Sequence, residues 1–334
     1  MNVRGEILGT ALAVVAAAGV ASTQTMPTSV DALVSAAKNA AGLEWPGTFL
    51  RLCVVPLPTA GRGAAVRGAA PNAAPPGPPA KSIWYAEPAK VADNFYFLGT
   101  KIHHAWALVG SDGIINFEAL FDYAAPDEIA DGMRKLGLDA NKVKYVVLSH
   151  AHGDHDGGAR FLQDKMPAAR LIYGGPDWDA VDKSTNRPGG KPNRDMVGTD
   201  GTKLSVGDAS VQIVTTPGHT AGTLSFLFEV RDNGKPLRVA YVGGTAIPFD
   251  GTAAYYDGYI ASVNKMAKAA ADFGATVLLS NHTEFDNGYY KAHTAAHRKP
   301  GEANPFDVGR AAVGRYFTVV EDCVTAVRLR AGAT

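Results

Sequence analysis

The sequence predicts an α/β fold in which two β-sheets pack face to face and helices cover their outer faces. Three observations support this prediction. After residue 81 the chain shows short apolar runs followed by helical periodicity, and this order occurs twice. The run Val143–Ser149 is continuously apolar, which is typical of a buried strand. Apolar residues make up 46% of the 334-residue chain, enough for a large core and too much for a disordered protein.

Charge and hydropathy exclude several classes of protein. The chain has 32 Lys and Arg residues against 32 Asp and Glu residues, so it lacks the basic excess of a nucleic-acid-binding protein. Beyond the N-terminus no apolar run approaches the ~20 residues of a membrane span. We therefore expect a small-molecule substrate, with no nucleic-acid partner and no membrane span after signal cleavage. The sequence does not indicate an oligomeric state.

The N-terminus has the pattern of a secretory signal peptide. Arg4 precedes the aliphatic and small-residue stretch Ile7–Val20, and Gly19-Val20-Ala21 places small residues where a signal peptidase would cleave. An ordinary N-terminal helix is the alternative interpretation. With residues 1–21 as signal peptide, the protein is expected to be periplasmic or secreted.

Three further segments follow. Residues 22–58 are expected to form an N-terminal extension that contains a short helix, residues 59–80 a linker rich in Pro, Ala and Gly, and residues 81–334 the folded domain. An oxidising compartment permits a disulfide between the two cysteines, Cys53 and Cys323. Two unrelated buried thiols are the alternative.

The first half of the domain is expected to begin with a strand meander. Its strands are predicted at Phe95–Gly99, Ala105–Val109 and Gly113–Phe117, followed by the buried strand Val143–Ser149 and a strand at Arg170–Tyr173. Helices are predicted at Pro126–Leu136, Ala159–Met166 and Asp177–Asp182.

The second half repeats this order. Strands are predicted at Leu204–Val206, Val211–Thr215, Leu224–Val230, Leu237–Val242 and Thr276–Ser280, with a hairpin turn at Asn233-Gly234. Helices are predicted at Tyr256–Phe273 and Val308–Arg330; the apolar stripe of the second is Val313, Phe317, Val320, Val324 and Val327. His293 and His297 fall in a polar segment and are expected to be solvated.

Five of the nine histidines form clusters at the ends of predicted strands. The segment His150-Ala151-His152-Gly153-Asp154-His155 follows the buried strand, His219 lies in Thr216-Pro217-Gly218-His219-Thr220, and His282 follows the last strand. Loops at strand ends are where a rigid scaffold can direct side chains toward one point.

This pattern predicts a metal site. His150 and His152 are two residues apart in extended chain, so both rings point the same way, and Gly153 permits the turn that brings Asp154 and His155 to a second point. His219 can complete the first site and His282 the second. Scattered structural histidines are the alternative, but three imidazoles and a carboxylate in six residues would be costly to bury without a cation.

The H-x-H-x-D-H segment, the later T-P-G-H-T segment and the final N-H resemble the metallo-β-lactamase superfamily, over about residues 84–282. The resemblance implies an αββα sandwich, two mixed β-sheets flanked by helices, in which residues 81–334 form a metallohydrolase domain. Carried over residue by residue, His150, His152 and His219 would hold one Zn²⁺, and Asp154, His155 and His282 a second.

The resemblance is greatest to subclass B3. Thioesterases and nucleases of the superfamily usually place a metal-bridging Asp where this chain has Gly244, and B1 lactamases use a Cys ligand near that position. The lead-in from Trp84 through Asp93-Asn94-Phe95-Tyr96 also resembles B3. Two features depart from the family pattern. Either Asn116 or Glu118 replaces a supporting Asp or that support is lost, and Thr245 is the one hydroxyl where B3 enzymes often use serines for the substrate carboxylate.

The expected activity is zinc-dependent hydrolysis of a cyclic amide, a β-lactam, by metal-bound hydroxide that Asp154 orients. Thr245, His103 and His104 are candidate substrate contacts. A periplasmic hydrolase of a lactone or thioester is a second hypothesis, although Gly244 counts against the thioesterase. A metal-binding protein without catalysis is a third. A β-lactamase of this kind would confer antibiotic resistance.

Overall fold

The computed structural model describes residues 29–54 and 77–332. The helices and strands in these ranges are α1 Val30–Ala41, α2 Pro46–Cys53, α3 Lys81–Trp84, β1 Ala89–Ala92, β2 Phe95–Phe97, β3 Trp106–Gly110, β4 Gly113–Phe117, η1 Pro126–Ala130, α4 Asp131–Lys135, η2 Ala140–Lys142, β5 Val143–Val147, α5 Gly153–Asp156, α6 Ala159–Lys165, β6 Arg170–Gly174, α7 Gly175–Lys183, β7 Met196–Gly198, β8 Lys203–Val206, β9 Ala209–Thr215, β10 Leu224–Asp232, β11 Lys235–Val242, α8 Ala253–Phe273, β12 Val277–Ser280, α9 Thr283–Asp286, α10 Gly288–Ala296 and α11 Arg310–Arg330.

The described strands form two mixed sheets, as expected for the αββα sandwich. One sheet has the order β1-β2-β3-β4-β5-β6-β7, antiparallel from β1 to β4 and parallel from β4 to β7. The other has the order β12-β11-β10-β9-β8, in which only β11 and β12 are parallel. At the predicted hairpin turn, Asn233 and Gly234 have φ values of 52° and 74°, which suit a tight turn between twisted strands.

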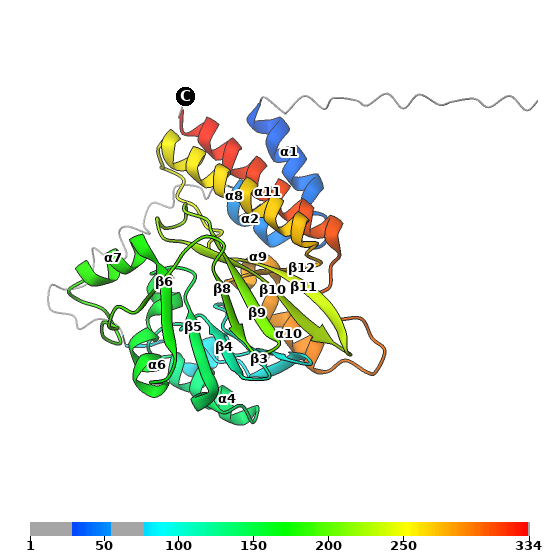
Figure 1. Ribbon diagram of the computed structural model, residues 1–334. Coiled ribbons are helices and arrows are strands. Elements are labelled where there is room, and N and C mark those ends of the chain that lie inside the picture. Colours follow the sequence, from blue (N-terminus) through cyan, green and yellow to red (C-terminus); the bar gives the residue numbers. More distant parts are fainter. Residues whose placement is uncertain (1–28, 55–76, 333–334) are drawn as a thin grey trace, which may run out of the picture.

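The two sheets bury an aromatic core between them. Phe117 stacks on Phe228 with ring centroids 4.9 Å apart, and Trp106 stacks on Phe95 at 4.9 Å. Helices α8 and α11 cover the outer face of the five-stranded sheet, and α4, α6 and α7 cover the outer face of the other (Figure 1). Because both outer faces are covered, the strands contain long apolar runs in place of strict alternation.

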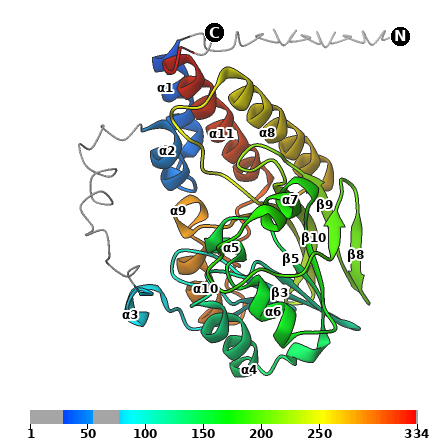
Figure 2. The ribbon, with the colours of Figure 1, turned by 90° about the vertical axis from the view of Figure 1, so that its left-hand side faces the viewer.

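Helix α11 is more deeply buried than its predicted stripe suggests. The five stripe residues are buried, and so are Tyr316, Val319 and Cys323 beside them. Helices α1 and α2 pack along α11 on the side away from the sheet (Figure 2), and Trp45 donates a hydrogen bond from its ring to the Ala312 carbonyl at 2.7 Å. A helix covered on two sides shows little amphipathic contrast in its sequence.

Several local expectations were incomplete. The helix expected at Pro126–Leu136 begins with a π-helical turn before α4, and β1, β7 and α10 were not predicted. Helix α10 contains His293, which was expected to be solvated. Its ring instead packs edge-on against Tyr289, and its Nε2 is buried. His297 is exposed, as expected.

The N-terminal segment is part of the folded unit where the structure describes it. Cys53 and Cys323 form a disulfide, with Cα atoms 4.7 Å apart, that ties α2 to α11. Thr48 of α2 donates a hydrogen bond to the Phe285 carbonyl at 2.6 Å, next to the loop that carries His282. The expected signal peptide and residues 59–76 of the expected linker lie outside the described residues. The helices in residues 29–54 and 77–332 include no candidate for a membrane span.

Replacing both cysteines by serine is expected to lower the free energy of unfolding by about 2–5 kcal/mol, because the disulfide restricts the unfolded chain over a loop of 270 residues. Urea unfolding of the oxidised parent and the double variant measures this difference. The reduced parent is the control and should behave like the double variant. Equal stability of all three proteins would contradict the prediction, as would rapid thiol labelling of the unfolded, oxidised parent.

Candidate metal centre

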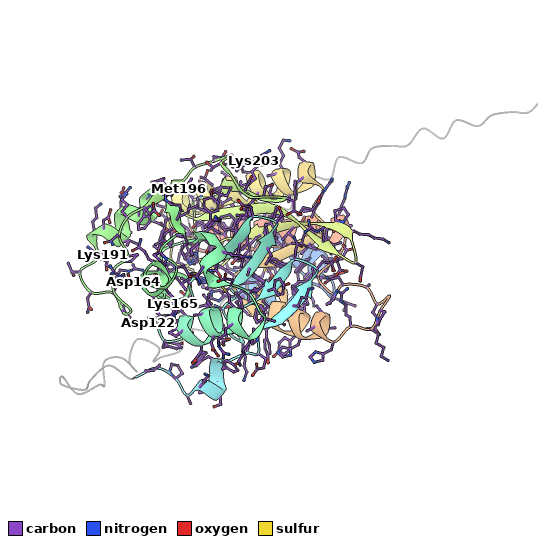
Figure 3. The ribbon with its side chains drawn as sticks, turned by 60° about the horizontal axis from the view of Figure 1, so that its bottom comes forward. Asp122, Asp164, Lys165, Lys191, Met196 and Lys203 are labelled. Atoms are coloured by element: carbon purple, nitrogen blue, oxygen red, sulfur yellow. A yellow bond between two sulfur atoms is a disulfide. The ribbon has the colours of Figure 1, made fainter. Side chains whose placement is uncertain are left out.

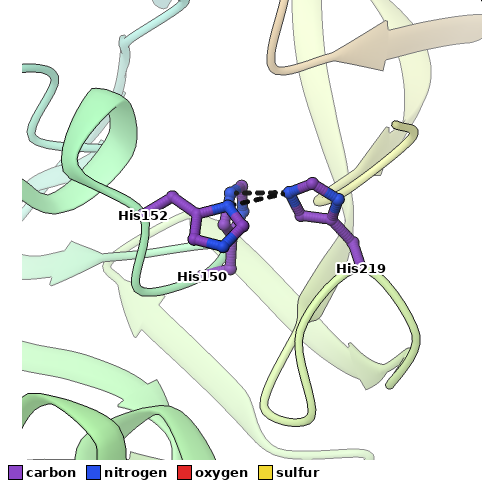
Figure 4. A group of neighbouring side chains, drawn as sticks. All are labelled: His150, His152 and His219. Atoms are coloured by element: carbon purple, nitrogen blue, oxygen red, sulfur yellow. Dashed lines mark hydrogen bonds between the residues drawn. The ribbon is translucent and has the colours of Figure 1, made fainter. Parts of the chain in front are cut away.

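Three histidines predicted to act together converge at one edge of the sandwich. His150 and His152 follow β5, and His219 follows β9 in the other sheet. Nε2 of His219 lies 3.2 Å from Nε2 of His150 and 3.0 Å from Nδ1 of His152 (Figure 4). The site forms here because the carboxyl ends of β5, β9, β11 and β12 meet at this edge.

The hydrogen bonds of these rings show that a cation fits between them. Nδ1 of His150 donates to the Gly243 carbonyl at 2.8 Å, and Nδ1 of His219 donates to the Ala246 carbonyl at 2.7 Å. The Nε2 atoms of both rings therefore carry lone pairs, and these lone pairs face each other. Two acceptors at this distance repel unless a cation lies between them, and neutral imidazole is a common ligand of metal ions.

The second group also comes together, and it adjoins the first. Oδ2 of Asp154 is 3.3 Å from Nε2 of His155 and 3.2 Å from Nε2 of His282, and the two imidazole nitrogens are 2.8 Å apart. The rings of His150 and His155 have centroids 4.5 Å apart. His155 belongs to α5 and His282 immediately precedes α9, so the two rings meet where these helices begin (Figure 2). The arrangement offers two neighbouring positions for metal ions.

Burial keeps three of these imidazole rings unprotonated. Desolvation lowers the pKa of His155 to about 3 and that of His219 to about 4, and it holds the pKa of His150 well below its usual value. Burial alone would raise the pKa of Asp154, but hydrogen bonds and the proximity of His155 and His282 lower it below its ordinary value. His150, His155 and His219 are therefore neutral and Asp154 is ionised, and these are the forms that bind a metal ion.

Of the two residues considered as replacements for the supporting Asp, Glu118 is the one whose side chain lies beside a predicted ligand. It is fully buried, accepts hydrogen bonds from the Tyr241 hydroxyl at 2.8 Å and the Ser149 amide at 3.3 Å, and lies 3.8 Å from Nδ1 of His155. Its φ of 66° is uncommon for a residue other than glycine and is supported by Asn116, whose amide donates to the Glu118 carbonyl at 2.7 Å. Burial raises the pKa of Glu118 to about 8.

Two expected substrate contacts are wrong. The Thr245 side chain is buried, and its hydroxyl lies 2.7 Å from the Tyr316 hydroxyl and 3.2 Å from that of Ser280, inside the protein. His104 is also buried. Its Nδ1 lies 2.8 Å from the Ser280 carbonyl and its Nε2 lies 2.8 Å from the Thr283 hydroxyl. Neither side chain can reach a substrate. His103, in contrast, lies at the second group, 3.6 Å from Asp154.

The backbone at Gly244 leaves no room for the bridging Asp of the thioesterases. A Cβ atom at this position would lie 2.5 Å from Cβ and 2.8 Å from Cγ of His219, closer than such atoms approach in proteins. A carboxylate side chain at position 244 would therefore require the His219 side chain to move.

Asp177, at the start of α7, is a positioning residue that sequence reasoning missed. Its Oδ2 accepts hydrogen bonds from the Ala151 amide and the Thr220 hydroxyl, both at 2.8 Å, and its Oδ1 accepts from the Gly222 amide at 2.9 Å. One buried carboxylate thus joins the loop of His150 and His152 to the loop of His219. The available signal was an acidic residue at the start of a predicted helix, which is too common to single out.

Replacing Asp177 by asparagine is expected to weaken metal binding about 10- to 100-fold, as loss of an outer hydrogen-bond partner typically does. The asparagine NH₂ group cannot accept the hydrogen bonds that the lost oxygen accepted. Metal titration followed by elemental analysis measures the effect. Asp179→Asn, on the exposed side of the same helix, is the matched control. Equal metal affinity in both variants would show that Asp177 does not position the loops.

A groove adjoins the site. It has a volume of about 980 Å³ and is lined by apolar side chains, among them Pro79, Phe121 and Tyr123, together with the backbone of Gly153. Asp122, another of its lining residues, is labelled in Figure 3. Arg187 also lines the groove, but it forms an ion pair with buried Asp156. The apolar part of the groove is therefore suited to an apolar part of a substrate, while Asp122 adds a carboxylate to the lining.

Comparison with known proteins agrees with this geometry. Residues 98–232 match the metallo-beta-lactamase superfamily. Among solved structures, the fold is similar to that of the subclass B3 metallo-beta-lactamase BJP-1 of Bradyrhizobium japonicum (TM-score 0.60, 23% identity, 74% of this chain and 96% of that one). It is also similar to that of FEZ-1 of Legionella gormanii (TM-score 0.64, 19% identity, 75% of this chain and 98% of that one).

Two curated relatives are similar in sequence over part of the chain. A hydroxyacylglutathione hydrolase of Gloeothece citriformis is 26% identical over 186 residues, which is 54% of this chain and 61% of the relative. The N-acyl homoserine lactonase AttM of Agrobacterium fabrum is 36% identical over 115 residues, or 32% of this chain and 43% of the relative. The chain thus spans about half the length of the curated relatives it matches.

These similarities and the two adjoining histidine groups indicate a dinuclear metal site. Residues 98–232 thus match the metallo-β-lactamase superfamily, and the chain has the fold of the B3 metallo-β-lactamases.

Proposed function

We propose that this protein is a hydrolase with two zinc ions that opens the ring of a β-lactam. The observation that carries the proposal is the pair of adjoining ligand groups, with five imidazoles and one carboxylate between them. Nitrogen and oxygen ligands in groups of three suit zinc, and three protein ligands leave a coordination position for water or substrate. We assign His150, His152 and His219 to the first ion, and Asp154, His155 and His282 to the second.

The metal ions, when bound, would activate water at neutral pH and polarise the substrate carbonyl. The chain's own residues would position the reactants. The Asp154 carboxylate accepts a hydrogen bond from the attacking water and so orients it. Phe121 and Tyr123 hold an uncharged substituent of the substrate in the groove. Water adds to the carbonyl carbon, the carbon–nitrogen bond of the ring breaks, and the nitrogen takes up a proton.

A lactone is the second candidate substrate, and two observations favour it. The similarity to the lactonase AttM reaches 36% identity, and Thr245, the expected contact for a β-lactam carboxylate, is buried away from the site. A thioester is disfavoured because Gly244 excludes the bridging carboxylate.

Elemental analysis of the zinc-loaded protein tests the metal content, and two ions per chain are expected. Initial rates with a penicillin, a carbapenem, an acyl lactone and a thioester then test the substrate. Hydrolysis of a β-lactam with the highest kcat/KM supports the leading proposal, and preference for the lactone replaces it with the second. Two bound ions without hydrolysis of any of the four compounds would indicate a metal-binding protein without catalysis.

We also propose that the protein acts in the periplasm or outside the cell. The apolar N-terminal stretch and the disulfide support this location. Recovery of the protein in the periplasmic or medium fraction, with its N-terminus near residue 22, is expected. Recovery of the uncleaved chain from the cytoplasm would contradict the proposal.

A further inference from the structure

The side chain of His103 lies against the second ligand group, although the residue comes from the connection between β2 and β3. Its Nε2 is 3.6 Å from Oδ2 of Asp154, and its ring meets that of His282 edge-on with centroids 4.9 Å apart. The side chain is only 15% exposed. The ring packs edge-on against Phe121 at 5.0 Å, and within the described chain neither of its nitrogens forms a hydrogen bond.

The backbone around His103 holds the ring in this position. The Thr283 amide donates to the Ile102 carbonyl at 2.8 Å, and the His104 amide donates to the Asn281 carbonyl at 3.0 Å. This short antiparallel bridge fixes the strand-like segment beside the loop of His282. Since successive side chains of extended chain point to opposite sides, His104 enters the interior while His103 faces the site.

The distance from His103 to Asp154 distinguishes a hydrogen bond between the two side chains from joint coordination of a metal ion. A separation of 3.6 Å between nitrogen and oxygen is too long for a hydrogen bond. Two ligand atoms that are each bound to a tetrahedral zinc ion lie roughly 3.4 Å apart. The separations of Asp154 Oδ2 from the nitrogens of His155 and His282 are 3.3 and 3.2 Å, so the position of His103 continues the same pattern.

We infer that His103 is a fourth protein ligand of the second metal ion, together with Asp154, His155 and His282. The inference rests on the proposed two-zinc site. It gives the two ions different coordination. The first keeps three protein ligands and an open position, whereas the second is closed by four, as in sites that hold an ion permanently.

Titration of the metal-free protein with Co²⁺ tests the inference without an activity measurement. In His103→Ala, one of the two ions should bind at least about tenfold more weakly and the other with unchanged affinity. His297→Ala removes an exposed histidine and is the matched control. Circular dichroism and thermal unfolding verify that both variants fold. Two ions bound with the parent's affinities in His103→Ala would overturn the inference, whereas a parent that binds fewer than two ions would overturn the proposed function.

A second variant separates coordination from a hydrogen bond to Asp154. The amide of His103→Gln extends about as far as Nε2 of the histidine and can donate a hydrogen bond to Asp154, but an amide is a poor zinc ligand. This variant should bind the second ion as weakly as His103→Ala. Recovery of the parental affinity with glutamine would overturn the inference.

Discussion

Replacing His219 with alanine is expected to lower kcat/KM roughly 100-fold or more at matched metal occupancy, beyond what loss of an outer hydrogen-bond partner costs. The substitution leaves only His150 and His152 for the first ion, and it removes the ring whose Nε2 lies 3.2 and 3.0 Å from their nitrogens. It also removes the hydrogen bond from Nδ1 of His219 to the Ala246 carbonyl. Steady-state kinetics with the best substrate of the panel, together with elemental analysis of each sample, measures the effect.

The comparison variant is His282→Ala, which leaves the three histidines of the first group intact. It should bind the first ion normally, bind the second more weakly, and retain more activity than His219→Ala. Asp154→Asn should lose activity beyond its loss of metal, since it also removes the group that orients the attacking water. A His219→Ala protein as active as the parent at equal zinc content would show that the three ligands of the first ion have been assigned wrongly.

Much of the site could be predicted because its geometry is local. The spacing within His150–His155 determines which way those side chains point, and the ends of buried strands bring His219 and His282 to the same edge of the sandwich. The order of strands and helices was equally informative. Val143–Ser149 and the Asn233-Gly234 turn, for example, each carry a strong local signal.

The residues that escaped prediction depend on contacts between distant segments. His103 and His104 are neighbours in sequence, and only the bridge to residues 281–283 decides that one faces the site and the other the interior. Asp177 joins two loops that lie on either side of it in the sequence. Thr245 was expected to contact the substrate, but its hydroxyl forms a hydrogen bond with that of Tyr316 in α11, which lies 71 residues further along the chain.

In the metal-free protein, the stability of the Glu118→Gln variant relative to the parent is expected to increase as the pH rises. Burial raises the pKa of Glu118 to about 8 from 4.5. Between these values the unfolded chain releases a proton that the folded protein keeps, so the parent loses stability with rising pH and the glutamine variant does not. The difference in stability is expected to grow by about 2–3 kcal/mol between pH 5 and pH 7. Because parent and variant are compared at both pH values, the contributions of the other buried acids and histidines to the pH dependence of stability cancel.

When metal is bound, glutamate at position 118 should be more favourable than glutamine. A cation held by His155 favours the ionised form of Glu118, because the carboxylate lies only 3.8 Å from Nδ1 of that ring and its negative charge is attracted to the cation and to the polarised imidazole. Glu118→Gln should therefore weaken binding of the second ion about 10- to 100-fold while it stabilises the metal-free chain. Urea unfolding in chelator at the two pH values and Co²⁺ titration at neutral pH measure the two effects, with Glu229→Gln at the surface as control. A stability difference independent of pH would show that Glu118 is ionised in the metal-free protein. Unchanged metal affinity would show that it does not support His155.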